Sequence, residues 1–89
     1  MIHVEEISKT SFKVTVDDAT TTVHWVTLTP EDYLDLTDGR VSHKQLVAMS
    51  FEFLLEREPN TSILRQFELP AIARYFPEYP EEIQERIGD

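Results

Sequence analysis

Hydrophobic and polar residues alternate along the first third of the chain. Phe12, Val14 and Val16 are separated by single polar residues, which is the period of a strand that buries one face. A turn-forming acidic pair follows, and residues 20–28 are then rich in threonine and valine, which favour strands. Residues 1–8 alternate less regularly. We predict an antiparallel hairpin that the N-terminal segment extends to a small meander.

The second strand of this hairpin carries apolar side chains on both faces. His24, Val26 and Leu28 share one face of the strand. Val23 and Trp25 share the other face, and if helices cover the first one, Trp25 forms an outer apolar patch typical of an interface. The alternative is that further chain buries Trp25 in the core. Val23 and Trp25 are therefore candidate interface residues.

The longest helical pattern covers residues 42–58, SHKQLVAMSFEFLLERE. Ser42 and Gln45 have the spacing of a capping box, in which each side chain bonds a free backbone N–H at the helix start. The apolar side chains span an arc of roughly 220° at 100° per residue, so the helix has contacts on more than one side. Pro59 ends it, because the residue before a proline disfavours the α conformation.

Shorter helical segments flank this central helix. Thr29 precedes a proline and two acidic residues, a combination typical of a helix start, and Gly39 can end that helix in a left-handed conformation. Residues 63–67 fit a short helical turn, and Pro70 and Pro80 each introduce a further short helix.

Together these elements predict an α+β fold. A small antiparallel β-meander over about residues 2–28 is followed by a helical part, with a central helix at 42–58 and three or four short helices. A chain of 89 residues is the size of one domain, so we assign residues 1–89 to a single domain.

The composition narrows the function classes. The formal net charge of −9 is spread over both halves of the chain, and such a surface repels the phosphate backbone of nucleic acids. The absence of cysteine excludes disulfides and thiolate chemistry. No apolar run reaches the ~20 residues that span a membrane, and the N-terminus lacks the pattern of a signal peptide. We expect a cytoplasmic protein that binds neither membranes nor nucleic acid.

Two runs in the second half of the chain are similar to known sequences. Residues 50–59, SFEFLLEREP, and residues 74–79, RYFPEY, resemble a group of short uncharacterised bacterial proteins. The resemblance implies a bacterial source and no particular activity, partner or site residue.

The chain carries no recognisable catalytic motif. Nucleophile-elbow, phosphate-loop and helical metal-ligand patterns are missing, so we expect neither an enzyme nor a cofactor. His3 and His24 could meet across the meander and bind a metal with Glu5, but half-exposed strand residues are the more economical interpretation.

Cations gather at the start of the central helix. Arg40, His43 and Lys44 surround the predicted cap residue Ser42, and free N–H groups at a helix start can hold an anion. The capping box uses some of those donors, which favours an ordinary capped helix start. The four residues are a candidate anion site.

Aromatic residues cluster near the C-terminus. Tyr75, Phe76 and Tyr79 lie among prolines and acidic residues, and they either pack the last helices onto the core or form an exposed strip that docks on a partner. These three residues complete the candidate interface.

The leading functional hypothesis is a non-enzymatic, small acidic cytosolic module for protein interaction or regulation. Its partner is an unknown protein or, in a homodimer, a second copy. One alternative is a small-molecule or anion-binding protein that uses the helix start at residues 40–44, and another is an acidic mimic of nucleic acid.

Overall fold

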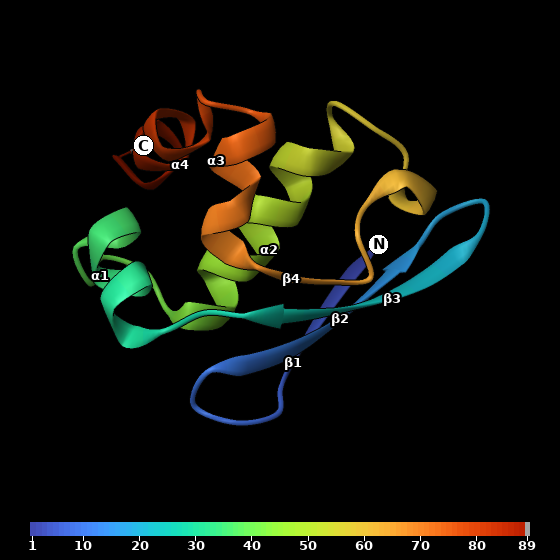
Figure 1. Ribbon diagram of the computed structural model, residues 1–89, viewed down its shortest axis with the longest axis horizontal. Coiled ribbons are helices and arrows are strands. Elements are labelled where there is room, and N and C mark those ends of the chain that lie inside the picture. The colour runs from blue at the N-terminus through green and yellow to red at the C-terminus, as the bar shows by residue number, and fades with distance from the viewer. Residues whose placement is uncertain (89) are drawn as a thin grey trace.

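A four-stranded sheet supports helices on one of its faces (Figure 1). The computed structural model describes residues 1–88. The strands β1 (Ile2–Glu6), β2 (Ser11–Asp17) and β3 (Thr21–Thr27) form the antiparallel meander. A fourth strand, β4 (Gln66–Glu68), pairs with β3 in parallel, so the spatial order is β1-β2-β3-β4. The α+β fold and the three-stranded meander expected from the sequence are confirmed.

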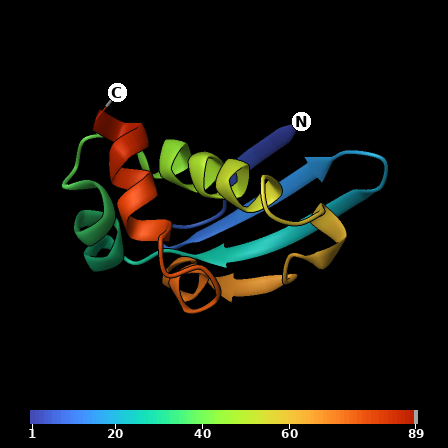
Figure 2. The ribbon, with the colours of Figure 1, turned by 90° about the horizontal axis from the view of Figure 1, so that it is seen from above.

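The helical part combines α-helices with single 3-10 turns. Its elements are α1 (Pro30–Thr37), α2 (His43–Leu55), the 3-10 turn η1 (Asn60–Ser62), the 3-10 turn η2 (Leu69–Ala71), α3 (Ile72–Tyr75) and α4 (Tyr79–Gly88). Figure 2 shows α2 lying across the sheet, with α4 beside it at the C-terminal end of the chain. No helix among residues 1–88 has the length and apolar character needed to cross a membrane.

The two faces of the sheet differ in the way the alternation predicts. Phe12 pairs with Val26 and Val14 with His24, and all four side chains are buried against the helices. Trp25, on the opposite face of β3, has no helix over it and is 46% exposed. The sheet therefore has one packed face and one open face.

The central helix begins with the predicted capping box. The Ser42 Oγ accepts a hydrogen bond from the backbone N–H of Gln45 at 3.1 Å, and the Gln45 Oε1 accepts one from the N–H of Ser42 at 2.8 Å. The helix ends at Leu55, three residues before the predicted end, and Arg57 and Glu58 close it with backbone bonds to Leu54. Its buried residues are Leu46, Val47, Ser50, Phe51, Phe53 and Leu54.

The first short helix also begins and ends near the predicted residues. The Thr29 Oγ1 accepts a bond from the N–H of Asp32 at 3.1 Å. Gly39 is left-handed at φ 76°, and Asp38 before it is left-handed as well at φ 56°. Aspartate tolerates this region better than most residues because its short side chain bonds locally.

One predicted element is wrong. Residues 63–67, expected as a helical turn, are instead extended and lead into β4, where the N–H of Trp25 donates to the carbonyl of Arg65 at 2.7 Å. A strand of three residues is too short to show a period in the sequence, and pairing with distant β3 decides its conformation.

Charged and aromatic side chains fasten α4 to the end of α2. Arg57 forms ion pairs with Glu78 and Glu82, and Arg86 pairs with Glu56 at 2.7 Å. The Arg57 guanidinium also lies 3.6 Å from the ring centroid of Phe53. These contacts fix the position of α4 beside the end of α2.

Candidate functional site: an apolar groove

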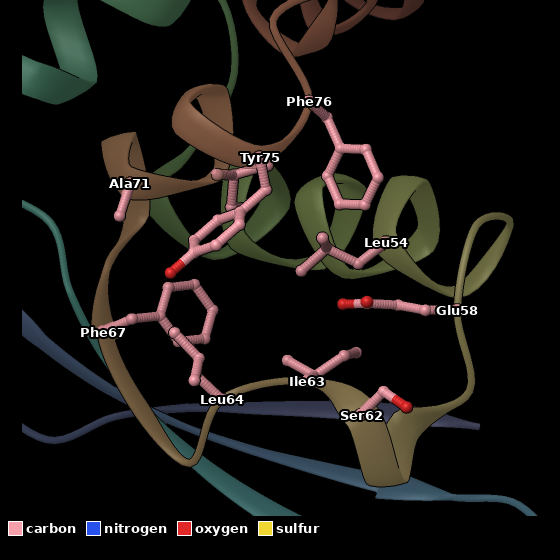
Figure 3. Close-up of a pocket in the computed structure, with 10 residues that line it drawn as sticks. Leu54, Glu58, Ser62, Ile63, Leu64, Phe67, Ala71, Tyr75 and Phe76 are labelled. Atoms are coloured by element: carbon pink, nitrogen blue, oxygen red, sulfur yellow. The ribbon is translucent and has the colours of Figure 1, made fainter.

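An apolar groove of about 350 Å³ lies where the end of α2, the segment after η1, and α3 meet (Figure 3). Its floor consists of the buried residues Leu54, Ile63 and Ile72. Half-buried Phe67 and Phe76 form its walls. Each of the three segments therefore contributes apolar surface to one concave site.

Two exposed apolar residues stand at the rim of the groove, which also includes the polar Ser62. Leu64 is 51% exposed and Tyr75 is 66% exposed, and both line the groove. Isolated apolar side chains are common on protein surfaces, but a contiguous apolar patch marks an interaction site. Leu64 and Tyr75 stand at the edge of the buried floor, so the exposed apolar surface of the groove lies at its rim.

One carboxylate projects into this apolar space. Figure 3 shows the side chain of Glu58 extending from the turn that follows α2 toward Leu54 and Ile63. Glu58 is half-buried, and its carboxylate forms no hydrogen bond or ion pair with any side chain among residues 1–88. The groove thus combines apolar walls with one uncompensated negative charge.

Aromatic contacts in the core fix the two walls. The Phe76 ring packs edge-on against Phe53, with centroids 5.9 Å apart, and the Phe67 ring lies 6.0 Å from that of Phe51. Phe51 and Phe53 are fully buried residues of α2. The walls are consequently held in place before any ligand binds, which lowers the entropic cost of binding.

A buried polar network positions Leu64 at the rim. The His24 Nδ1 lies 2.7 Å from the carbonyl of Leu64, and because a carbonyl only accepts, Nδ1 carries the proton. The His24 Nε2 then accepts from the hydroxyl of Thr22 at 2.8 Å. The Asn60 amide donates to the Thr22 Oγ1 at 3.0 Å and to the carbonyl of Thr20 at 2.7 Å.

This network requires a neutral histidine. Burial lowers the pKa of His24, and the charge of nearby Arg65 lowers it further, whereas the bond to Leu64 has the opposite effect. Protonation would place a second N–H against the Thr22 oxygen, which already accepts from Asn60. His24 is therefore a structural residue that ties the segment forming the rim of the groove to the sheet.

Trp25 and Val23 occupy the outer face of the sheet, as one of the two sequence interpretations expected. The Lys13 Nζ lies 5.8 Å from the Trp25 ring centroid, within range of a cation–π interaction. Val23 is half-buried on the same outer face, where it pairs with Thr15 of β2. Polar residues, Ser11, Thr27 and Gln66, line the surface beside Trp25, whereas the groove is lined mainly by apolar residues.

The aromatic cluster of the C-terminus is divided by the fold. Tyr79, a candidate interface residue, is fully buried, and its hydroxyl donates to the Ser50 Oγ at 2.6 Å while Ser50 donates to the carbonyl of Leu46. Burial raises the pKa of the Tyr79 phenol. Tyr79 is thus a core residue, and Tyr75 and Phe76 alone belong to the groove.

The candidate anion-site residues at the start of α2 make separate local contacts. The His43 ring stacks on Tyr33 with centroids 3.8 Å apart, and Ser42 is engaged in the capping box. Arg40 lines a depression with the acidic residues Asp35 and Asp38, while Lys44 is exposed on the first turn of the helix. Ser42 and His43 therefore both have local partners, and the anion site stays a prediction.

The hypothetical metal site is not formed. His3 and His24 lie on opposite faces of the sheet, because His3 pairs with Thr15 whereas His24 pairs with Val14. Glu5 shares the outer face with His3. Within residues 1–88, no group of three or more histidine and acidic side chains could hold a metal ion.

No known protein family matches the chain, and neither does any curated protein or solved structure. Sequence analysis missed the groove because Leu54, Ile63 and Phe67 have the pattern of core residues, and their meeting at the surface depends on β4. Tyr75 and Phe76, which the sequence already indicated as candidate interface residues, both line the groove.

Proposed function

We propose that the protein is a non-enzymatic interaction module of the cytoplasm that docks a partner protein on the groove. The observation that carries this proposal is the continuity of buried floor, fixed aromatic walls and exposed rim around one free carboxylate. The partner presents a bulky apolar side chain next to a lysine or arginine. The apolar group covers Leu54 and Ile63, and the cation pairs with Glu58.

The exposed rim favours a protein segment over a small molecule. Small-molecule sites bury most of their ligand within an enclosed cleft. Leu64 and Tyr75 instead stand more than half exposed at the edge of the groove, where only a larger surface would cover them. Aromatic residues are enriched at the buried centre of protein interfaces, which fits the composition of this rim.

Selection from a library of displayed random peptides tests the proposal. We expect the protein to enrich sequences with a bulky apolar residue next to lysine or arginine. Leu64→Asp should abolish binding of those peptides, and Thr15→Asp, on the open face of the sheet, should leave it unchanged. Enrichment of no peptide, or equal binding by the Leu64→Asp variant, would overturn the proposal.

Glu58→Gln separates the two parts of the recognition. It retains the shape of the side chain and removes its charge, so peptides with a basic residue should bind at least about tenfold more weakly. Peptides that lack a basic residue should bind both proteins equally. The folded state of each variant is checked by far-UV circular dichroism.

A further inference from the structure

The chain itself carries the combination of groups that its groove would recognise. Arg74 and Tyr75 are adjacent in α3, both are exposed, and Tyr75 lines the rim of the groove. Arg74 forms no ion pair within residues 1–88, and neither does Glu58. The exposed ring that lines the groove is therefore followed back along the chain by a free cation, and the floor of the same groove has a free carboxylate beside it.

Such an arrangement is self-complementary under two-fold symmetry. In an isologous dimer, each contact occurs twice, because a residue on one protomer meets its counterpart site on the other. We infer that a second copy of this chain docks on the groove, with Tyr75 of each protomer entering the groove of its partner and Arg74 pairing with Glu58. This inference rests on the proposed function and names the partner.

The charge distribution permits this contact in a strongly acidic protein. Each copy carries a formal charge of −9, but repulsion between exposed charges is screened beyond about 8 Å at physiological ionic strength. The nearby acidic residues Glu56, Glu78 and Glu82 are already paired with arginines of the same chain. Two reciprocal Arg74–Glu58 pairs then fix the register of the two protomers.

Burial of the exposed rim residues favours association of the two protomers. Tyr75 is the most exposed of the large side chains around the groove, and an aromatic ring removes a large apolar area from water when it is covered. The half-buried walls Phe67 and Phe76 are held by core aromatic contacts, so they need no rearrangement to receive it. Docking of a second copy covers both rim and floor at once.

Sedimentation equilibrium of the full chain, at protein concentrations up to about 1 mM, tests the dimer. We expect a monomer–dimer equilibrium that Glu58→Arg and Arg74→Glu each weaken by at least about tenfold, because each variant opposes like charges in both pairs. An equimolar mixture of the two variants should restore association as a heterodimer, since both charge pairs are then opposite. Trp25→Ala is the matched control on the open sheet face and should leave the affinity unchanged.

A chain that stays monomeric throughout this range would overturn the inference. So would a dimer that Trp25→Ala dissociates while Glu58→Arg leaves it intact, because the open face of the sheet would then be the interface. The mixing experiment excludes misfolding as the cause of lost association, since unfolded variants do not restore one another. Peptide binding to a monomeric wild-type protein would overturn the dimer alone and leave the proposed docking function standing.

Discussion

Replacing Asn60 tests the buried polar network that joins η1 to the sheet. Asn60 is 4% exposed, and its amide donates to the carbonyl of Thr20 and to the Thr22 Oγ1. A hydrogen bond of this kind contributes about 1 kcal/mol net, so Asn60→Ala should lower the free energy of unfolding by about 2 kcal/mol. Asparagine is used here as a double donor, which alanine removes without adding charge.

Asn60→Asp retains the shape of the side chain but replaces the hydrogen-bond donor of the amide with an acceptor. The oxygen that replaces the Asn60 Nδ2 would face the Thr20 carbonyl and the Thr22 oxygen, and the Thr22 hydroxyl cannot turn toward it because it donates to His24. Burial of a carboxylate without a cation adds a further penalty, and we expect a total loss of about 3–5 kcal/mol near pH 7. The isosteric variant should thus be less stable than the alanine variant.

The destabilisation caused by Asn60→Asp should depend on pH. Burial raises the pKa of the new carboxyl above its unfolded value of about 3.9. The folded state then gains a proton before the unfolded state as the pH falls, and the protonated group can donate to the Thr20 carbonyl. The excess destabilisation of Asn60→Asp over Asn60→Ala should therefore shrink between about pH 7.5 and 5.

Urea unfolding followed by circular dichroism at both pH values measures these differences against the wild type at the same pH. Thr61→Asp adds the same charge at an exposed neighbouring position and should change stability by no more than about 0.5 kcal/mol. If Asn60→Asp is as stable as Asn60→Ala near pH 7, or if Thr61→Asp costs as much, the polar network is not what holds this segment.

Three further predictions concern the core, a helix cap and a histidine. Leu54→Ala should cost about 3–5 kcal/mol in a urea melt because it leaves a cavity under the groove, and a loss below about 1 kcal/mol would show that Leu54 is not core. Ser42→Ala should cost about 1 kcal/mol through the lost cap of α2, and an unchanged midpoint would contradict that role. The lowered pKa of His24 means that its contribution to stability is complete above about pH 6.5, the value in the unfolded chain, and is lost as the pH falls below it. The difference in the free energy of unfolding between wild type and His24→Gln should become smaller as the pH falls below that value. A difference that stays constant would refute the neutral buried histidine.

The sequence alone determined the elements whose causes are local. Alternation of Phe12, Val14 and Val16 with polar residues was sufficient for the meander, because one face of a strand must be buried. The capping box at Ser42 and the cap at Thr29 located two helix starts, since their hydrogen bonds lie within four residues. The two faces of β3 were also correctly separated, although which face packs against helices was left open.

The tertiary structure decided the position of everything that depends on contacts between distant segments. β4 exists because residues 66–68 pair with β3 some 40 residues earlier, and the same pairing brings Phe67 beside Leu54 and turns core-like residues into a surface groove. The tertiary structure also buries Tyr79 against Ser50 and leaves Tyr75 exposed, although the two tyrosines are four residues apart in the same aromatic run. Local patterns specify which residues are apolar, but whether an apolar residue is covered depends on where the rest of the chain folds, which no short window of sequence contains.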